Sequence, residues 1–405
     1  MADFYAPCPK GLEGPLADEL QALGVIDARA RDAGVAFRGT LRTAMLVNLE
    51  SRIASRVLMR VGDATYRSED DVYAAALAVR WEEWFGPELT LKVETSAIKC
   101  PLKSIDFLTL RVKDAICDRL RERRGARPSI DTREPDVQVH LHLDRLQMTL
   151  YLDTTGAGLF RRGDARDTGL APLKKNLAAG MLRIAGWQPG VPLYDPMCGS
   201  GTILSEAAEI SLQRAPGLGR PFAFHNLAGF LASDWNPMYD AAEERALPVQ
   251  PLPIWGSDIA GSAVEMTREN LTALGLQDSV HLKQVNVLET SAPAPEGMLI
   301  TNPPYGVRVG EDEEMAAFYP EFGHLLKRRF AGWRAFILSG DLRLAKLIRL
   351  AASRRTPLFN GQIDCRLFEY RLVAGSNRTD DEAGDSRQDR LRSGSRETGN
   401  QEQND

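Results

Sequence analysis

The sequence has few cysteines: only five occur in 405 residues, namely Cys8, Cys100, Cys117, Cys198 and Cys365. No two of them form a CxxC pair, the spacing that is typical of structural zinc sites and redox motifs. This scatter argues against a disulfide framework and against a bound metal, and it is typical of proteins of the reducing cytoplasm. We therefore predict a cytoplasmic protein without a metal site.

Long hydrophobic runs and an excess of positive charge are also missing. No apolar run approaches the ~20 residues that a membrane span needs, and the N-terminus lacks the basic start and apolar stretch of a signal peptide. The 50 Lys and Arg are outnumbered by 55 Asp and Glu, which gives a net charge of −5. A protein that coats nucleic acid indiscriminately is therefore disfavoured, and any RNA or DNA contact must come from local basic patches.

The length and the hydrophobic periodicity predict several domains. Residues 1–55 are expected to form a small α+β unit, because "KGLEGPLADELQALG" has helical apolar spacing and "GVAFRG" is a short strand between glycines. In residues 56–158 the alternating strands "ELTLKVETSA" and "DVQVHLHLD" flank an amphipathic helix. Residues 376–405 contain one large apolar residue, Leu391, which predicts a disordered tail.

Residues 159–375 follow a different pattern. Short apolar strands alternate with helical segments, and the strands are "VPLYD", "LPIWGSD", "VHLKQVNV", "GMLITN" and "AFILSGD". This alternation predicts an α/β domain with a parallel sheet covered by helices. Ligands of such sheets bind beyond the carboxyl ends of the strands, where the polar motifs of this region lie.

The first of these motifs is the glycine-rich loop in "VPLYDPMCGSGTILSEAA". Gly199 and Gly201 let the backbone turn sharply and approach a ligand, and Thr202 stands where the following helix begins. The phosphate-binding patterns GxxxxGK[ST] and GxGxxG are both absent. Asp195, directly after the strand, would repel a phosphate. It suits a cationic ligand such as the amino group of S-adenosylmethionine (SAM).

The next two strands also end in polar residues. Asp258 can accept hydrogen bonds from both ribose hydroxyls of a nucleoside cofactor, and Asn286 can meet an adenine edge through its amide. Asp and Asn commonly cap helices, so each residue alone is weak evidence. Their order, one per strand after the glycine loop, favours a nucleoside cofactor.

The fourth strand ends in Asn302, Pro303, Pro304 and Tyr305. Methylation of an exocyclic amine requires its lone pair to be freed from the ring, and acceptors that hold the amine protons achieve this. The Asn302 side-chain oxygen and the Pro303 carbonyl are such acceptors, and the two prolines fix the carbonyl direction. Tyr305 offers a ring for a flipped-out base. The alternative for an isolated "NPPY" is a proline turn that closes a strand.

Together, "DPMCGSGT", "SDI" and "NPPYG" resemble the motifs of class I SAM-dependent methyltransferases that modify exocyclic amines. The segments "KGLEGPLADELQALG", "SRIASRVL" and "GAGLFRRGDARDTGLAPLKKNLAAGML" are similar to bacterial THUMP-domain methyltransferases, above all the 23S rRNA guanine-N2 methyltransferase family. "NGQIDCRLFEY" resembles the closing hairpin of that family. In some bacteria this enzyme is fused to a second methyltransferase that makes 7-methylguanine, and the present chain resembles the guanine-N2 half.

The resemblance implies a fold, a cofactor and a site. It implies a ferredoxin-like unit at 1–55, a THUMP RNA-binding domain at 56–158 and a Rossmann-like seven-stranded methyltransferase domain at 159–375. Asn302 to Tyr305 would hold the target base. Family members commonly carry Asp where this chain has Asn286. The residues implied in SAM binding are Asp195, Pro196, Cys198, Gly199, Gly201, Thr202, Asp258, Ile259, Asn286 and Val287.

Arginines gather in two segments, "RLRERRGARP" and "FRRGDAR", against the acidic balance of the whole chain. For any one arginine, a solvated helix face is an equally ordinary explanation. The clusters as a whole favour contact with RNA phosphates, as expected of a THUMP domain that recognises RNA mainly by shape. The arginines predicted to bind RNA are Arg119, Arg121, Arg123, Arg124, Arg127, Arg161 and Arg162.

Several alternatives remain open at this point. A nucleophilic role for Cys198 is disfavoured, because a cysteine in this loop would face the cofactor and the "NPPY" motif itself contains no cysteine. His140 and His142 share one strand face but lack a third metal ligand nearby. The leading prediction is methylation of guanine N2 in 23S rRNA. The alternatives are a tRNA guanine-N2 methyltransferase and, less favoured, a non-catalytic RNA-binding assembly factor.

Overall fold

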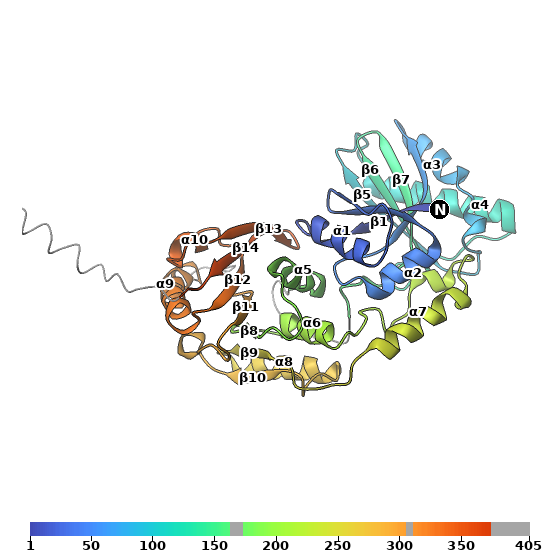
Figure 1. Cartoon of the computed structure of the whole chain (residues 1–405). Coiled ribbons are helices and arrows are strands. Elements are labelled where there is room, and N and C mark those ends of the chain that lie inside the picture. Colours follow the sequence, from blue (N-terminus) through green and yellow to red (C-terminus); the bar gives the residue numbers. More distant parts are fainter. Residues whose placement is uncertain (163–172, 305–310, 374–405) are drawn as a thin grey trace, which may run out of the picture.

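Two seven-stranded sheets organise the chain in the computed structural model, which describes residues 1–162, 173–304 and 311–373 (Figure 1). The predicted tail at 376–405 lies outside these residues. None of the described helices is long and apolar enough to cross a membrane. The seven-stranded α/β domain and the α+β module before it agree with the predicted fold class.

The first sheet has the strand order β2-β3-β1-β4-β7-β6-β5. Every neighbouring pair is antiparallel except β5 and β6. β4 pairs with both β1 and β7, so the sheet continues across the predicted boundary at residues 55 and 56. The strands are β1 (Ala2–Pro7), β2 (Arg29–Arg31), β3 (Gly34–Gly39), β4 (Leu58–Thr65), β5 (Leu91–Ile98), β6 (Val137–Asp144) and β7 (Gln147–Asp153).

The helices of this first part bury the apolar stripes that the sequence predicted. α1 places Leu16 and Leu20 in the core next to Leu12, and α4 buries a longer stripe that includes Val112 and Ile116. α4 ends at Gly125, which adopts the left-handed conformation that glycine tolerates best. The elements are α1 (Glu13–Ala22), α2 (Leu41–Glu50), α3 (Glu69–Ala78), the short helix η1 (Trp81–Glu83) and α4 (Ile105–Arg124).

The second sheet has the order β10-β9-β8-β11-β12-β14-β13. Its first five strands are parallel, as predicted, and the β13–β14 hairpin contributes the two antiparallel strands. The strands are β8 (Leu193–Asp195), β9 (Ile254–Asp258), β10 (His281–Gln284), β11 (Gly297–Thr301), β12 (Trp333–Ser339), β13 (Arg354–Asn360) and β14 (Ile363–Arg371).

Helices cover both faces of this sheet. Along β11, Leu299 packs into a cluster with Phe322 of α9, while Ile300 packs into the cluster that contains Leu204 of α6. Figure 1 shows α9 and α10 on the outer side, and α5 and α6 on the side facing the first sheet. The elements are α5 (Lys175–Ala185), α6 (Thr202–Ser211), η2 (Ala223–Asn226), α7 (Ala232–Arg245), α8 (Gly261–Ala273), η3 (Val287–Glu289), α9 (Glu311–Arg329) and α10 (Leu344–Leu347).

A buried ionic cluster joins the two halves. Glu206 of α6 is fully buried, and Arg52 Nη1 lies 2.8 Å from its Oε1. Arg162 Nη1 lies 3.0 Å from each carboxylate oxygen of the same glutamate. Burial alone would raise the pKa of Glu206, but the two guanidinium groups hold it below its usual value. The charge of Glu206, on the helix that follows the glycine-rich loop, is thus neutralised in part by Arg52 of the N-terminal half.

Candidate active site

A cavity of about 530 Å³ opens at the carboxyl ends of β8, β9 and β11, where parallel sheets bind their ligands. Three consecutive polar strand ends, at Asp258, Asn286 and Asn302, meet there as the sequence predicted. Five further predicted residues join them on the wall. The predicted residues that line the cavity are Pro196, Gly199, Asp258, Ile259, Asn286, Val287, Asn302 and Pro304.

The glycine loop is held in shape by β9 and α8. Cys198 N–H donates to Ser257 O (2.9 Å), and Gly199 N–H donates to the carboxylate of Asp258 (3.1 Å). Thr267 of α8 donates its hydroxyl to Gly199 O (2.7 Å). The loop conformation therefore depends on two elements that follow it in the chain.

Gly201 is required for both its backbone angle and its lack of a side chain. Its φ is +78°, and a Cβ at this position would lie 2.5 Å from Thr267 Cγ2. No larger residue fits without displacing α8 or the loop. This close packing brings the start of α6 against α8 and fixes the position of the loop above the sheet.

Asp258 and Asn286 each use side-chain oxygens to order the wall. Asp258 Oδ2 accepts from Gly199 N–H, and its Oδ1 accepts from Ala260 N–H at 3.0 Å. Asn286 Oδ1 accepts from Leu288 N–H at 3.0 Å and so caps η3. An Asp at position 286 would make the same cap, so the Asn preserves the local fold.

Asp195 lies behind the loop rather than on the cavity wall. It is 2 % exposed, and its Oδ1 accepts a 3.3 Å hydrogen bond from Met197 N–H. Burial, reinforced by the charge of Asp258, raises its pKa to about 7. Cys198, Gly201 and Thr202 are likewise absent from the described wall. The predicted SAM contacts of these four residues stay predictions. Asp195, Cys198 and Gly201 are buried, whereas Thr202, the first residue of α6, is half-buried.

The burial of Cys198 also bears on its chemistry. Its thiol lies 3.7 Å from Thr267 Oγ1, and burial raises its pKa. A protonated, buried thiol is a poor nucleophile, so packing explains this residue.

Asn302 carries the most informative atom of the site. Its Oδ1 is buried and has no hydrogen-bond partner among the described residues, although the residue lines the cavity. A buried acceptor without a partner is costly, and a donor brought by a ligand would remove that cost. Pro303 is buried behind the wall and Pro304 is exposed on it. Tyr305, the predicted stacking residue, lies outside the described residues.

Three apolar wall residues were not predicted: Met197, Leu288 and Phe318. The first two neighbour predicted positions in the sequence, so their adjacency was an available indication. Phe318 comes from α9, and its place on the wall follows from how that helix packs over the sheet. A motif search at strand ends could not have found it.

The predicted RNA-binding arginines differ in their availability. Arg119 makes a two-pronged contact with Glu82 (3.0 and 2.6 Å), whereas Arg121 and Arg127 share Asp118 and stay largely exposed. Arg124 donates to the backbone oxygen of Glu82 at 2.8 Å and is exposed, as is Arg123. The predicted surface patch at the end of α4 therefore exists, with Arg119 serving mainly as an anchor.

Arg161 and Arg162 are adjacent in the sequence but differ in their exposure to solvent. Arg161 is exposed and lies over the ring of Phe160, 6.0 Å from its centroid. Arg162 is buried on Glu206, so it cannot reach an RNA phosphate, and its predicted RNA contact is corrected.

The two histidines of β6 have polar partners that suffice to explain them. His140 lies 3.3 Å from Asp153, and His142 Nδ1 lies 2.9 Å from Ser96 Oγ. Among the described residues, no group of three or more His, Cys, Asp or Glu could hold a metal ion.

Comparison with protein families matches each part of the chain. Residues 3–58 match the RlmL ferredoxin-like domain, residues 66–153 the THUMP domain, and residues 162–369 the RMKL-like methyltransferase domain. The last match spans just over half of the chain and contains the whole cavity. The chain belongs to the RMKL-like methyltransferase family. It combines that domain with a THUMP domain and an RlmL ferredoxin-like domain.

Individual relatives extend this result for the RMKL-like chain. It is 42% identical to "Ribosomal RNA large subunit methyltransferase K/L" of Syntrophotalea carbinolica, over 91% of the chain but 53% of the relative. It thus spans about half the length of the K/L relatives. It is 38% identical to "Putative RNA methyltransferase" of Synechocystis sp., covering 91% of the chain and 96% of the relative.

A solved structure supports the fold over nearly the same span. The crystal structure of "a putative methyltransferase complexed with SAH" is 30% identical, with a TM-score of 0.84 over 92% of this chain and 98% of that chain.

Proposed function

We propose that the protein transfers a methyl group from SAM to the exocyclic N2 amine of a guanine in 23S rRNA. In this proposal the base is flipped out of its strand into the cavity. The observation that carries the proposal is the buried Oδ1 of Asn302, which has no partner among the described residues and would accept a hydrogen bond from an amine of the substrate. The K/L name of the relatives favours large-subunit rRNA as the RNA.

The cavity has the chemistry that a nucleoside cofactor needs. Asp258 lies on the wall at the end of β9, Asn286 follows β10, and apolar side chains such as Ile259 and Phe318 complete the enclosure. The ribose would be held by Asp258, the adenine by Asn286 and its apolar neighbours, and the amino-acid end by the loop at Gly199. When bound, SAM supplies an electrophilic methyl group on its sulfonium sulfur. The SAH complex of the similar structure supports this assignment.

The protein's own residues would then act on the amine. Asn302 Oδ1 and the Pro303 carbonyl would accept its two N–H groups, which localises the nitrogen lone pair and directs it at the methyl group. The site needs no strong base for this step, since positioning supplies most of the rate. Asp195 stabilises the glycine loop by accepting from Met197 N–H, and it does not contact the target amine of the base. Stacking of the base on Tyr305 remains part of the proposal.

RNA recognition is assigned to the N-terminal half. The THUMP match and the exposed arginines at the end of α4 support it, namely Arg121, Arg123, Arg124 and Arg127, together with Arg161. We also propose division of the chain at residues 55/56 and 158/159, which the ends of the family matches support.

Mass spectrometry of nucleosides from a strain that lacks this protein tests the proposal. We expect N2-methylguanosine to disappear from one position of 23S rRNA while tRNA stays fully modified. The purified protein should transfer the labelled methyl group of SAM to the rRNA of that strain and so restore N2-methylguanosine at that position. Loss from tRNA would instead identify the tRNA enzyme, and an unchanged nucleoside profile with no SAM binding would favour a non-catalytic assembly factor.

A further inference from the structure

One face of the first sheet carries a second, separate arrangement of side chains. Residues paired directly across antiparallel strands project from the same face. The register pairs Arg29 with Ala36, Ala36 with Tyr5, and Arg60 with Tyr151, so neighbouring strands contribute to one surface. We call this surface the arginine–tyrosine face. Its large side chains are Arg29, Arg31, Arg38, Arg60, Tyr5 and Tyr151.

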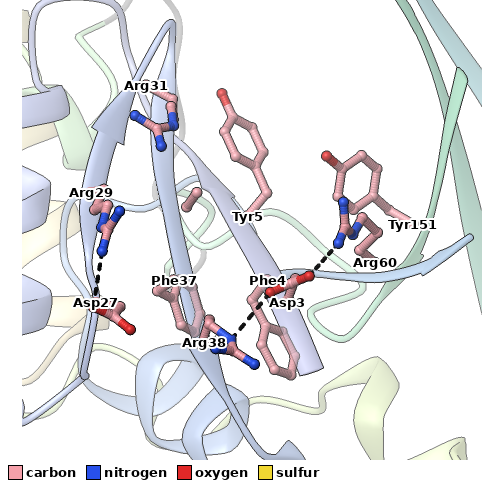
Figure 2. Close-up of a pocket in the computed structure, with 11 residues that line it drawn as sticks. Asp3, Phe4, Tyr5, Asp27, Arg29, Arg31, Phe37, Arg38, Arg60 and Tyr151 are labelled. Atoms are coloured by element: carbon pink, nitrogen blue, oxygen red, sulfur yellow. Dashed lines mark hydrogen bonds and ion pairs between the residues drawn. The ribbon is translucent and has the colours of Figure 1, made fainter. Parts of the chain in front are cut away.

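The arginine–tyrosine face is open, whereas the opposite face of the same strands is core. Phe4 and Phe37 alternate with the exposed residues, are 2 % exposed, and stack with ring centroids 5.2 Å apart on the buried side. On the open side the small residue Ala36 leaves a hollow of about 440 Å³ (Figure 2). The five strands from β2 to β7 make this surface about 20 Å wide.

The charges on this face are not balanced within it. Its four arginines meet three aspartates, Asp3, Asp27 and Asp63, in a chain whose net charge is −5; Arg60 lies 3.7 Å from Asp63. Arg29 lies 3.3 Å from Asp27, and Arg38 and Arg60 share Asp3, as Figure 2 shows. Arg31 has no ion-pair partner within the part of the chain that the structure describes. One positive charge is therefore in excess, on side chains that are mostly in contact with water.

Aromatic rings lie between these charges. The rings of Tyr5 and Tyr151 have centroids 6.2 Å apart and are inclined by 40° (Figure 2). The Tyr5 hydroxyl donates a 2.6 Å hydrogen bond to Asp32 O, which fixes its ring over the sheet. Rings flanked by arginines on an open sheet bind unpaired bases by stacking and their phosphates by charge.

We propose that the arginine–tyrosine face binds a single-stranded segment of the RNA substrate. This inference rests on the proposed function and adds a site to the α4 patch. Double-stranded RNA keeps its base faces stacked inside the helix, so it could use the arginines but not the tyrosines. The combination of both side-chain types favours a single strand, whose bases stack on Tyr5 and Tyr151 while the arginines contact its phosphates.

Binding of a fluorescein-labelled oligouridine, followed by anisotropy over a range of salt concentrations, tests this site in the full-length protein. The variant Arg29→Gln/Arg31→Gln changes two exposed residues of an edge strand, removes both positive charges and keeps a polar side chain at each position. Each lost phosphate contact should reduce the slope of log affinity against log salt by about 0.7. The variant Tyr5→Leu/Tyr151→Leu should bind roughly tenfold or more weakly, with an unchanged salt slope.

Arg268→Gln/Arg371→Gln is the matched control, because it removes two exposed arginines from the other half of the molecule. This control should keep the wild-type slope. Equal slopes for both arginine variants, or a loss confined to a duplex probe, would overturn the site. SAM binding should be unchanged in every variant. A wild-type protein that transfers no methyl group to RNA contradicts the proposed function, whereas an active wild type with an inert arginine–tyrosine face contradicts only this inference.

Discussion

Asn302 lies on the cavity wall and carries a buried acceptor, the side-chain oxygen Oδ1. Its substitution should change the rate of methyl transfer without changing the affinity for SAM. We expect Asn302→Ala to lower methyl transfer by about a hundredfold or more, because it removes an acceptor that acts on the amine. Asn302→Asp keeps an oxygen at the same place and should retain more activity. The measurement is transfer of labelled methyl from SAM to rRNA, with SAM affinity determined by calorimetry.

SAM affinity should stay near the wild-type value in both Asn302 variants. A fully active Asn302→Ala protein would remove this residue from the mechanism. Equal loss of activity and SAM affinity would place it in cofactor binding instead.

Asp195 makes the stability of the fold depend on pH. Burial raises its pKa to about 7, well above the ordinary value of 3.8. The folded protein therefore holds one more proton than the unfolded chain between about pH 4 and pH 7, and stability falls as the pH rises through this window. Asp195→Asn cannot ionise, so its stability relative to wild type should rise across the window and level off above about pH 7. Urea unfolding at a series of pH values measures this difference.

Asp278→Asn, an exposed change in the same half, is the control for the loss of one negative charge. If both variants differ from wild type by constant amounts at all pH values, Asp195 is not the group that titrates.

At the scale of elements, the contact between the glycine loop and α8 determines the shape of the cavity. Gly201→Ala combines a left-handed backbone with a Cβ placed 2.5 Å from Thr267 Cγ2. We expect this variant to lose about 2 kcal/mol or more of stability and to bind SAM at least roughly tenfold more weakly. Thr267→Ser should rescue it in part, since the clashing methyl is removed and the hydroxyl that donates to Gly199 O is kept. Thermal unfolding and calorimetry provide both quantities.

Gly275→Ala is the matched control, because Gly275 has a similar φ of +61° with open space around it. It should lose about 1 kcal/mol through the backbone alone and keep its affinity for SAM. If Gly201→Ala behaves like this control, the close contact with α8 is unimportant.

The elements of the second sheet were predictable because each strand is an apolar run followed by a polar residue. That pattern also predicted which strand ends meet, since parallel strands bring their carboxyl ends to one edge. It did not predict how deeply each polar residue is buried. Asp195 and Asp258 end neighbouring strands, yet Asp195 is buried behind the loop whereas Asp258 lies on the cavity wall. Phe318 was missed because its position depends on the packing of a whole helix.

The sequence pattern also did not predict which basic residues are buried. Arg161 and Arg162 are adjacent in "FRRG", and only the second finds a buried partner, 44 residues away in the sequence. The arginine–tyrosine face combines residues from five strands, several of them outside any arginine cluster. Such sets become visible only once the register is known.

At the scale of the whole molecule, the buried cluster around Glu206 couples the two halves. Arg52→Met should cost about 3 kcal/mol, because it leaves the fully buried carboxylate of Glu206 with one cationic partner fewer. Adding Glu206→Gln should recover part of that loss, since an amide needs no counter-charge. Chemical unfolding of the single and double variants measures the coupling.

Arg268→Met, which breaks an exposed pair with Glu265, should cost less than about 1 kcal/mol and serves as the control. Additive losses in the Arg52 and Glu206 double variant would show that the two side chains do not stabilise each other.

The position of β4 has a consequence for how this protein can be divided. Its neighbours are β1 on one side and β7 on the other. A cut near residues 55 and 56 would separate the pairs Phe4–Met59 and Tyr5–Leu58, and it would leave each fragment with an unpaired strand edge that attracts other chains. A chimera that exchanges only the first 55 residues must therefore keep a β1 strand that pairs with Leu58 and Met59 of β4. The two modules are consecutive along the chain, and their strands form one continuous sheet.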